Sequence, residues 1–123
     1  MLVRASVWPG LPGYLGMWAW LLHRVSGLAL VFYLLLHIFV ISSSIRGKGS
    51  FDEVLGALQT PVFVVLDLFL LLAAAFHALN GIRIVLFDLG VGVRRQKAFF
   101  LGAVACTALI FAAAAIRVAP RLL

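Results

Sequence analysis

Charged residues are scarce in this sequence, and acidic residues are the scarcest of them. Asp, Glu, Lys and Arg together make up 11% of the 123 residues, and only four are acidic. A soluble domain of ordinary composition carries about 25% charged residues, because its surface must be hydrated. With 65% hydrophobic residues and a mean hydropathy of +1.19, the chain is predicted to lie in a lipid bilayer.

The sequence also lacks the motifs of several function classes. Its single cysteine, Cys106, excludes an internal disulfide bond and a cysteine-pair metal site, so packing is its expected role. The chain has no Walker loop, dinucleotide fingerprint, catalytic-triad pattern or internal repeat, and we assign no catalytic residue. The net charge of +6 comes from basic residues around the span ends, which favours anionic lipids or a docked protein as partners over nucleic acid.

Long hydrophobic runs fill most of the remaining sequence. A helix that spans a bilayer needs about 20 mostly apolar residues, and a barrel strand needs only about ten in alternation. Because the runs are long and rich in Leu, Ala and Phe, they favour helices. We predict an all-α integral membrane protein, a single membrane-anchor domain over residues 1–123, with transmembrane helices at about 18–42, 61–87 and 98–117.

The connecting segments differ from these runs in composition. Residues 42–53 carry serines, glycines and charges and are predicted to form a surface loop, whereas glycines in residues 88–97 are expected to end the second span. Residues 1–16 are predicted to form an interfacial lead-in. A secretory signal peptide is the alternative for residues 28–41, but that run starts far from the N-terminus and no small-residue cleavage site precedes the serines.

The distribution of basic residues predicts the orientation, since Lys and Arg concentrate on the cytoplasmic side. Six lie on the side of the N-terminus and second connector: Arg4, Arg24, Arg83, Arg94, Arg95 and Lys97. Four lie on the other side: Arg46, Lys48, Arg117 and Arg121. We therefore expect a multi-pass protein with its N-terminus in the cytoplasm and its C-terminus outside.

Polar side chains at membrane depth are costly and are therefore functional candidates. They are His23, Arg24, Ser26, His37, Asp67, His77, Asn80 and Arg83. His77 lies six residues before Arg83, which places it about 9 Å deeper in the bilayer. At that depth a neutral imidazole serves as a hydrogen-bonded core residue, a proton relay or an axial ligand of haem iron.

The residues that follow His77 allow a haem pocket. Gly81 lies four residues further on, on the same helix face, and leaves room for a flat porphyrin. Arg83 follows toward the cytoplasmic surface, where a haem propionate needs a cation. Close helix packing at Gly81 and interfacial anchoring by Arg83 are the alternatives.

The first span opens with "HRVSG", residues 23–27, preceded by Trp20. Arg24 and Ser26 provide charge and hydrogen-bond donors at the depth expected for a quinone headgroup, and Trp20 provides an aromatic edge. We therefore place all three residues in a candidate quinone site. Arg and Trp are also common interfacial anchors, which is the alternative interpretation.

His37 lies 13 residues after Arg24, or about 19 Å along a helix, so it is expected about 10 Å further outward than His77. The two histidines should therefore not share one iron. His37 is a candidate ligand of a second, outer haem, a packed core residue, or a quinone or proton contact. Asp67 is expected near the outer headgroups, paired with Arg117 or with a partner protein.

The motifs "HRVSG" and "HALNGIRIVLFD" together resemble those of the cytochrome b556 membrane-anchor subunits of succinate dehydrogenase, respiratory complex II. The resemblance implies a helical bundle with a second hydrophobic anchor subunit in a bacterial cytoplasmic membrane. It also implies iron–sulfur and flavoprotein subunits on the cytoplasmic face. By the same resemblance, His77 ligates haem b, His23 and Arg83 lie near the propionates with Gly81 in the pocket, and Arg24 belongs to the quinone site.

The resemblance further implies electron transport from succinate to ubiquinone or menaquinone, in the tricarboxylic acid cycle, with no activity of this subunit alone. One or two haems are implied, the second with His37 as its iron ligand. Ile84 and Trp20 stand where relatives often have histidine and serine. The rival hypotheses are a haem-free small transporter or proton-channel subunit, with a relay through His37, Asp67 and His77, and an anchor that has lost its haem.

Overall fold

The computed structural model describes residues 13–123, and these residues form helices and short connections without a β-strand. The α-helices are α1 (Gly13–Ser42), α2 (Lys48–Leu58), α3 (Pro61–Asp88) and α4 (Gln96–Val118). Short 3-10 turns occupy Ser43–Arg46, Val93–Arg95 and Ala119–Arg121. The all-α prediction is confirmed, whereas most of the predicted lead-in, including Arg4, lies outside the described residues.

Three of these helices are long and apolar enough to cross a membrane, as the hydrophobic runs predicted. They contain 30 residues in α1, 28 in α3 and 23 in α4. Most of their large hydrophobic side chains are exposed, and the buried hydrophobic residues are only Ala19, Phe87, Phe100 and Ala103 within residues 13–123. Lipid or other subunits must therefore cover most of the apolar surface.

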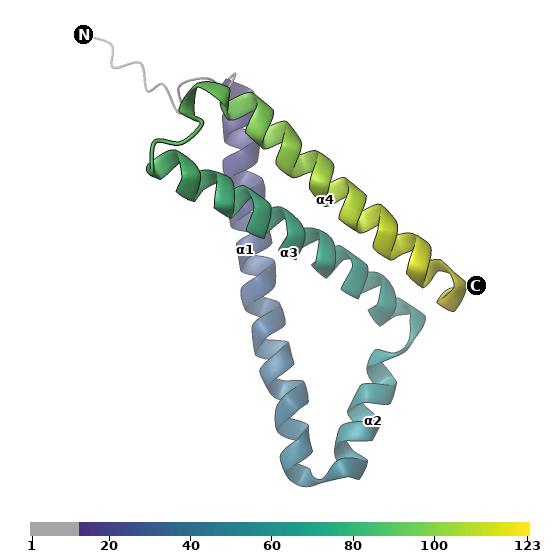
Figure 1. Cartoon of the computed structure of the whole chain (residues 1–123). Coiled ribbons are helices and arrows are strands. Elements are labelled where there is room, and N and C mark those ends of the chain that lie inside the picture. The colour runs from purple at the N-terminus through teal and green to yellow at the C-terminus, as the bar shows by residue number, and fades with distance from the viewer. Residues whose placement is uncertain (1–12) are drawn as a thin grey trace.

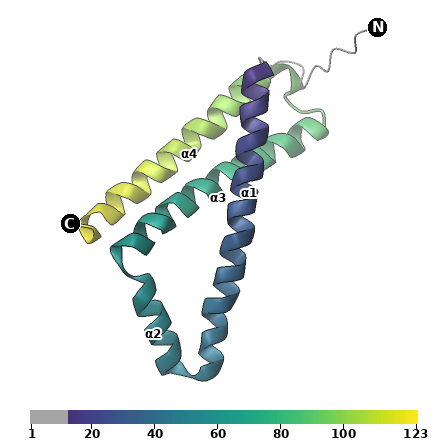
Figure 2. The ribbon, with the colours of Figure 1, turned by 180° about the vertical axis from the view of Figure 1, so that it is seen from behind.

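The long helices pack unevenly. α3 and α4 lie side by side and antiparallel, whereas α1 crosses α3 near one end and then diverges from it (Figures 1 and 2). The start of α1, the end of α3 and the start of α4 consequently gather at one end of the molecule. α2 joins the far end of α1 to the start of α3.

The first connector differs from its prediction, because the expected loop over residues 42–53 is mostly helical. Gly47, with a φ of 104°, separates the 3-10 turn from α2. On α2 the apolar side chains of Phe51 and Leu55 line a groove shared with α1 and α3. Lys48 and Asp52 form an exposed ion pair at 3.9 Å. The segment is helical although none of the α2 residues is buried, and its serines, glycines and charges did not predict this.

The end of α3 follows the prediction for the second connector. Gly90 adopts a left-handed conformation with a φ of 79°. Its N–H donates to the Phe87 carbonyl at 2.9 Å, and the Val91 N–H donates to the Leu86 carbonyl at 2.8 Å. These two bonds make a Schellman motif, which satisfies carbonyls that the last helical turn would otherwise leave free.

Replacing Gly92 with alanine should lower the thermal unfolding midpoint of the detergent-purified protein. Gly92 has a φ of 73°, where a side chain costs about 1–2 kcal/mol, and an added Cβ would lie 2.6 Å from the Phe99 ring. Gly102→Ala is the matched control, since nothing lies within 4 Å of its added Cβ. Equal midpoints for the two variants would contradict this account of the connector.

Candidate functional site

The crossing of α1 and α3 brings His23 and His77 into direct contact. Their rings stack with centroids 4.0 Å apart and planes inclined by only 6°. The two residues are 54 positions apart in the sequence. Both were predicted as site residues, but their contact was not, because it depends on where the two helices cross.

A hydrogen-bonded triangle fixes the ring of His77. Its Nδ1 lies 3.1 Å from the Ser26 hydroxyl and 3.1 Å from the backbone carbonyl of His23, and the Ser26 hydroxyl donates to that same carbonyl at 2.9 Å. Because a carbonyl only accepts, Nδ1 of His77 must carry the proton in this arrangement. A neutral His77 therefore keeps the lone pair on Nε2, the atom that can bind a metal.

Glycine on α1 permits this close approach. A Cβ added at Gly27 would lie 2.9 Å from Cε1 of His77, closer than real Cβ contacts. Across the crossing, a Cβ added at Gly81 would meet only Cε1 of His23, at 3.6 Å. Gly81 therefore faces His23 across the crossing with room for a Cβ, and its role in a porphyrin pocket stays a prediction.

Arg83 points into the protein rather than toward the headgroups. Its side chain is 4% exposed, and its Nε donates to Oδ1 of Asn80 at 2.9 Å. The guanidinium also lies 5.4 Å from the Phe87 ring centroid and 5.3 Å from that of Phe100 on α4. The charge of Arg83 is therefore buried between α3 and α4, which the interfacial-anchor interpretation did not expect.

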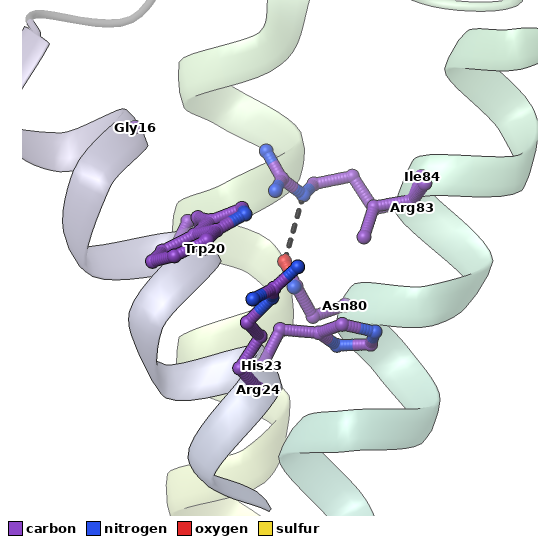
Figure 3. Close-up of a pocket in the computed structure, with 8 residues that line it drawn as sticks. Gly16, Trp20, His23, Arg24, Asn80, Arg83 and Ile84 are labelled. Atoms are coloured by element: carbon purple, nitrogen blue, oxygen red, sulfur yellow. Dashed lines mark hydrogen bonds between the residues drawn. The ribbon is translucent and has the colours of Figure 1, made fainter. Parts of the chain in front are cut away.

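A cavity of about 120 Å³ opens beside these residues. Figure 3 shows most of its lining side chains converging from α1 and α3. The lining residues are Gly16, Ala19, Trp20, His23, Arg24, Asn80, Arg83 and Ile84. Two residues predicted for a quinone site thus share one cavity with two predicted for haem propionates.

The polar atoms of the cavity are short of acceptors. Nδ2 of Asn80, Nη1 of Arg83 and Nδ1 of His23 are buried without a hydrogen-bond partner. The lining contains two arginines and no acidic residue. Buried donors in native proteins are normally satisfied, so the cavity is suited to a ligand that presents carbonyl or carboxylate oxygens.

Arg24 lies at the exposed side of the cavity. Its guanidinium stacks over the Trp20 ring at 4.5 Å from the centroid, a cation–π contact that holds the charge at the rim. Ser26 does not line this cavity, because its buried hydroxyl bonds to His77, and its quinone role stays a prediction. Trp20 and Arg24 are therefore the predicted quinone residues that the cavity brings together.

The outer polar residues lie elsewhere. His37 and Asp67 line a second groove of about 620 Å³ between α1, α2 and α3, where the Tyr33 ring lies 5.6 Å from that of His37. The expected Asp67–Arg117 pair is wrong, because the ion pair at Lys48 is the only one in residues 13–123. In the same part of the chain no three His, Cys, Asp or Glu side chains gather as a metal site.

Two buried polar residues had no predicted role. Asn80 was among the polar residues at membrane depth, and its spacing of three from Arg83 was the available signal for their contact. Gln96, 2% exposed with its Oε1 unpartnered, begins α4. Its neighbours Arg94, Arg95 and Lys97 made that position look like a solvated connector, so no sequence signal pointed to its burial.

The family comparison decides the broader identity. Residues 8–116 match the model of the family described as succinate dehydrogenase/fumarate reductase transmembrane subunit. The chain belongs to this family. It is a multi-pass membrane-anchor subunit of succinate dehydrogenase, and its place is within a multi-subunit enzyme.

Individual relatives agree with the family assignment. A succinate dehydrogenase hydrophobic membrane anchor subunit of Halobacterium salinarum is 41% identical over 99 residues, covering 80% of this chain and 76% of that protein. The succinate dehydrogenase 2 membrane subunit SdhC of Mycobacterium tuberculosis is 36% identical over 67% of this chain and 61% of its own length. A succinate dehydrogenase hydrophobic membrane anchor subunit of Archaeoglobus fulgidus is 35% identical over 80 residues, which cover 65% of this chain and 68% of that protein. The transporter hypothesis therefore loses its support.

Gly27→Ala should destabilise the α1–α3 crossing of this anchor subunit. The new methyl group would collide with the His77 ring, and overpacking of this kind costs about 1–3 kcal/mol. Gly81→Ala, whose Cβ would make an ordinary 3.6 Å contact, should behave like the unaltered protein. Thermal melts in detergent compare the two, and an equal loss in both would refute the special role of Gly27.

Proposed function

We propose that the subunit binds haem b and helps form the quinone-reduction site of a succinate:quinone oxidoreductase. It would act with a second hydrophobic anchor subunit and seat the iron–sulfur and flavoprotein subunits on the cytoplasmic face of a bacterial membrane. The observation that carries this proposal is the oriented imidazole of His77 beside a cavity rich in unpartnered donors. The N-terminus would lie in the cytoplasm and the C-terminus outside.

The residues at the crossing fit a haem. The bonds from Nδ1 of His77 to Ser26 and the His23 carbonyl fix its tautomer and leave Nε2 for iron, as outer hydrogen bonds commonly do for histidine ligands. The guanidinium of Arg83 suits propionate oxygens, as does the ring of His23 when its Nδ1 carries a proton. A bound haem would store or relay single electrons between the iron–sulfur partner and quinone.

A further residue to hold the haem iron would come from the partner anchor subunit. Within this chain the stacked neighbour of His77 is His23, whose ring lies parallel to it and not opposite an intervening iron. His37 remains our candidate ligand for a second haem on the outer side. Its imidazole is exposed in the outer groove.

Arg24 and Trp20 are our proposed contacts for the quinone headgroup. Arg24 can donate to a quinone carbonyl, and the Trp20 ring offers a flat apolar surface beside it. The cavity of about 120 Å³ is smaller than the roughly 300–1,000 Å³ of typical ligand pockets. Partner subunits would therefore supply the remaining walls, and ubiquinone or menaquinone would bind at the subunit boundary.

His77→Leu should remove a b-type haem from the assembled complex, because iron loses its axial nitrogen. Dithionite-reduced minus air-oxidised spectra and pyridine-haemochrome assays on the purified complex measure this loss. His37→Leu should keep that haem and lose only a second, outer one if two are present. A wild-type complex without any b-type signal would overturn the haem assignment.

Arg24→Ala should raise the KM for quinone about tenfold, the effect of losing one charged hydrogen bond. Succinate oxidation with a soluble dye that takes electrons directly from the flavoprotein should stay unchanged. Arg121→Ala, an exposed arginine at the far end of the chain, serves as the control. An unchanged quinone KM in Arg24→Ala would exclude Arg24 from the site.

A further inference from the structure

Asn80 is fully buried, at 0% exposure, and lines the cavity between α1 and α3. Its Oδ1 accepts the bond from Nε of Arg83, while its Nδ2 has no partner. An asparagine at membrane depth is costly unless its amide is used. A side-chain hydrogen bond within a membrane stabilises a protein by only about 0.6 kcal/mol on average. The single bond to Arg83 therefore does not offset the cost of burying the Asn80 amide.

Arg83 is held on several sides. Asn80 binds Nε, and the rings of Phe87 and Phe100 lie near the guanidinium. These contacts restrict a side chain that would otherwise have many rotamers. Nη1 remains buried without a partner, and no acidic residue within residues 13–123 pairs with Arg83.

A buried, uncompensated cation requires an acceptor from outside this chain, because desolvating a charge costs several kcal/mol. The two arginines of the cavity differ in this respect. Arg24 is exposed and stacked on Trp20, whereas Arg83 is buried and bonded to Asn80. Arg83 is thus held by a hydrogen bond inside the protein, whereas Arg24 is held at the exposed rim by its contact with Trp20 alone.

We propose that Asn80 is a positioning residue that holds the Arg83 guanidinium as a preformed donor for a ligand oxygen in the cavity. That oxygen belongs to a haem carboxylate or to a quinone carbonyl, which present the same acceptor chemistry. The inference rests on the proposed function, and it assigns Asn80 a role that acts through Arg83.

Asn80→Leu in the assembled complex tests this role, since leucine has a similar size but cannot accept from Arg83. If the oxygen is a quinone carbonyl, the KM for quinone rises about tenfold with little change in kcat or haem potential. If it is a haem carboxylate, the haem midpoint potential falls, because the cation no longer compensates the carboxylate, and the quinone KM is unchanged. Either result supports the proposal and identifies the ligand.

A double-mutant cycle separates positioning from general packing. Asn80→Leu alone should alter either the quinone KM or the haem midpoint potential. When Arg83→Gln is already present, Asn80→Leu should add no further change to that same quantity. Thr107→Val, a buried polar position on α4 outside the cavity, should leave both quantities unaltered. If Asn80→Leu prevents assembly, Asn80→Ser replaces it in the same cycle.

Unchanged quinone KM and haem potential in an assembled Asn80 variant would overturn the proposal. An additive effect in the Arg83→Gln background, or failure of both variants to assemble, would also overturn it, because Asn80 would then act independently or support only the fold. The wild-type complex is measured first. Absence of haem and of quinone reduction there would refute the proposed function itself, which distinguishes the two failures.

Discussion

The close contact of α1 with α3 at Gly27 is the constraint on which the rest of the site depends. Apolar side chains give helices no hydrophobic reason to associate within lipid, so van der Waals packing and hydrogen bonds must hold them together. Gly27 allows the van der Waals packing, because it has no side chain to collide with the His77 ring. Ser26 and the His23 carbonyl provide the hydrogen bonds through Nδ1 of His77. The same contact sets the position of Asn80 and Arg83, which follow on α3.

Residues 13–123 form a helical scaffold but only part of a binding site. The buried polar atoms of the subunit include donors without acceptors at the cavity, and its long helices expose most of their large hydrophobic residues. Both features require further molecules: oxygen acceptors at the cavity, and lipid or protein along the helices. A membrane anchor within a multi-subunit dehydrogenase meets these requirements, whereas an isolated protein would not.

Much of the site was predictable as a set of residues but not as a set of contacts. His23, Arg24, His77 and Arg83 stood out because polar groups are rare in the spans, and the structure places all four at the α1–α3 crossing. The direction in which each side chain points was harder to predict from the sequence. Ser26 binds His77 rather than lining the cavity, and Arg83 turns toward Phe100 rather than the headgroups. These directions depend on the rotation of each helix about its axis, which apolar spans without a polar face do not specify.

The sequence by itself determined the three spans, the glycine-marked end of α3 and the short list of polar residues at membrane depth. These follow from hydrophobic length, glycine conformation and the cost of burying polar groups, all of which are local properties. Only the tertiary structure decided that α2 is a helix, that His23 stacks on His77 and that Asn80 holds Arg83. The stack depends on the angle at which α1 crosses α3, which arises from packing between residues far apart in the chain. The direction of Arg83 depends in part on the Phe100 ring of α4, which the spacing of Asn80 and Arg83 along α3 does not reveal.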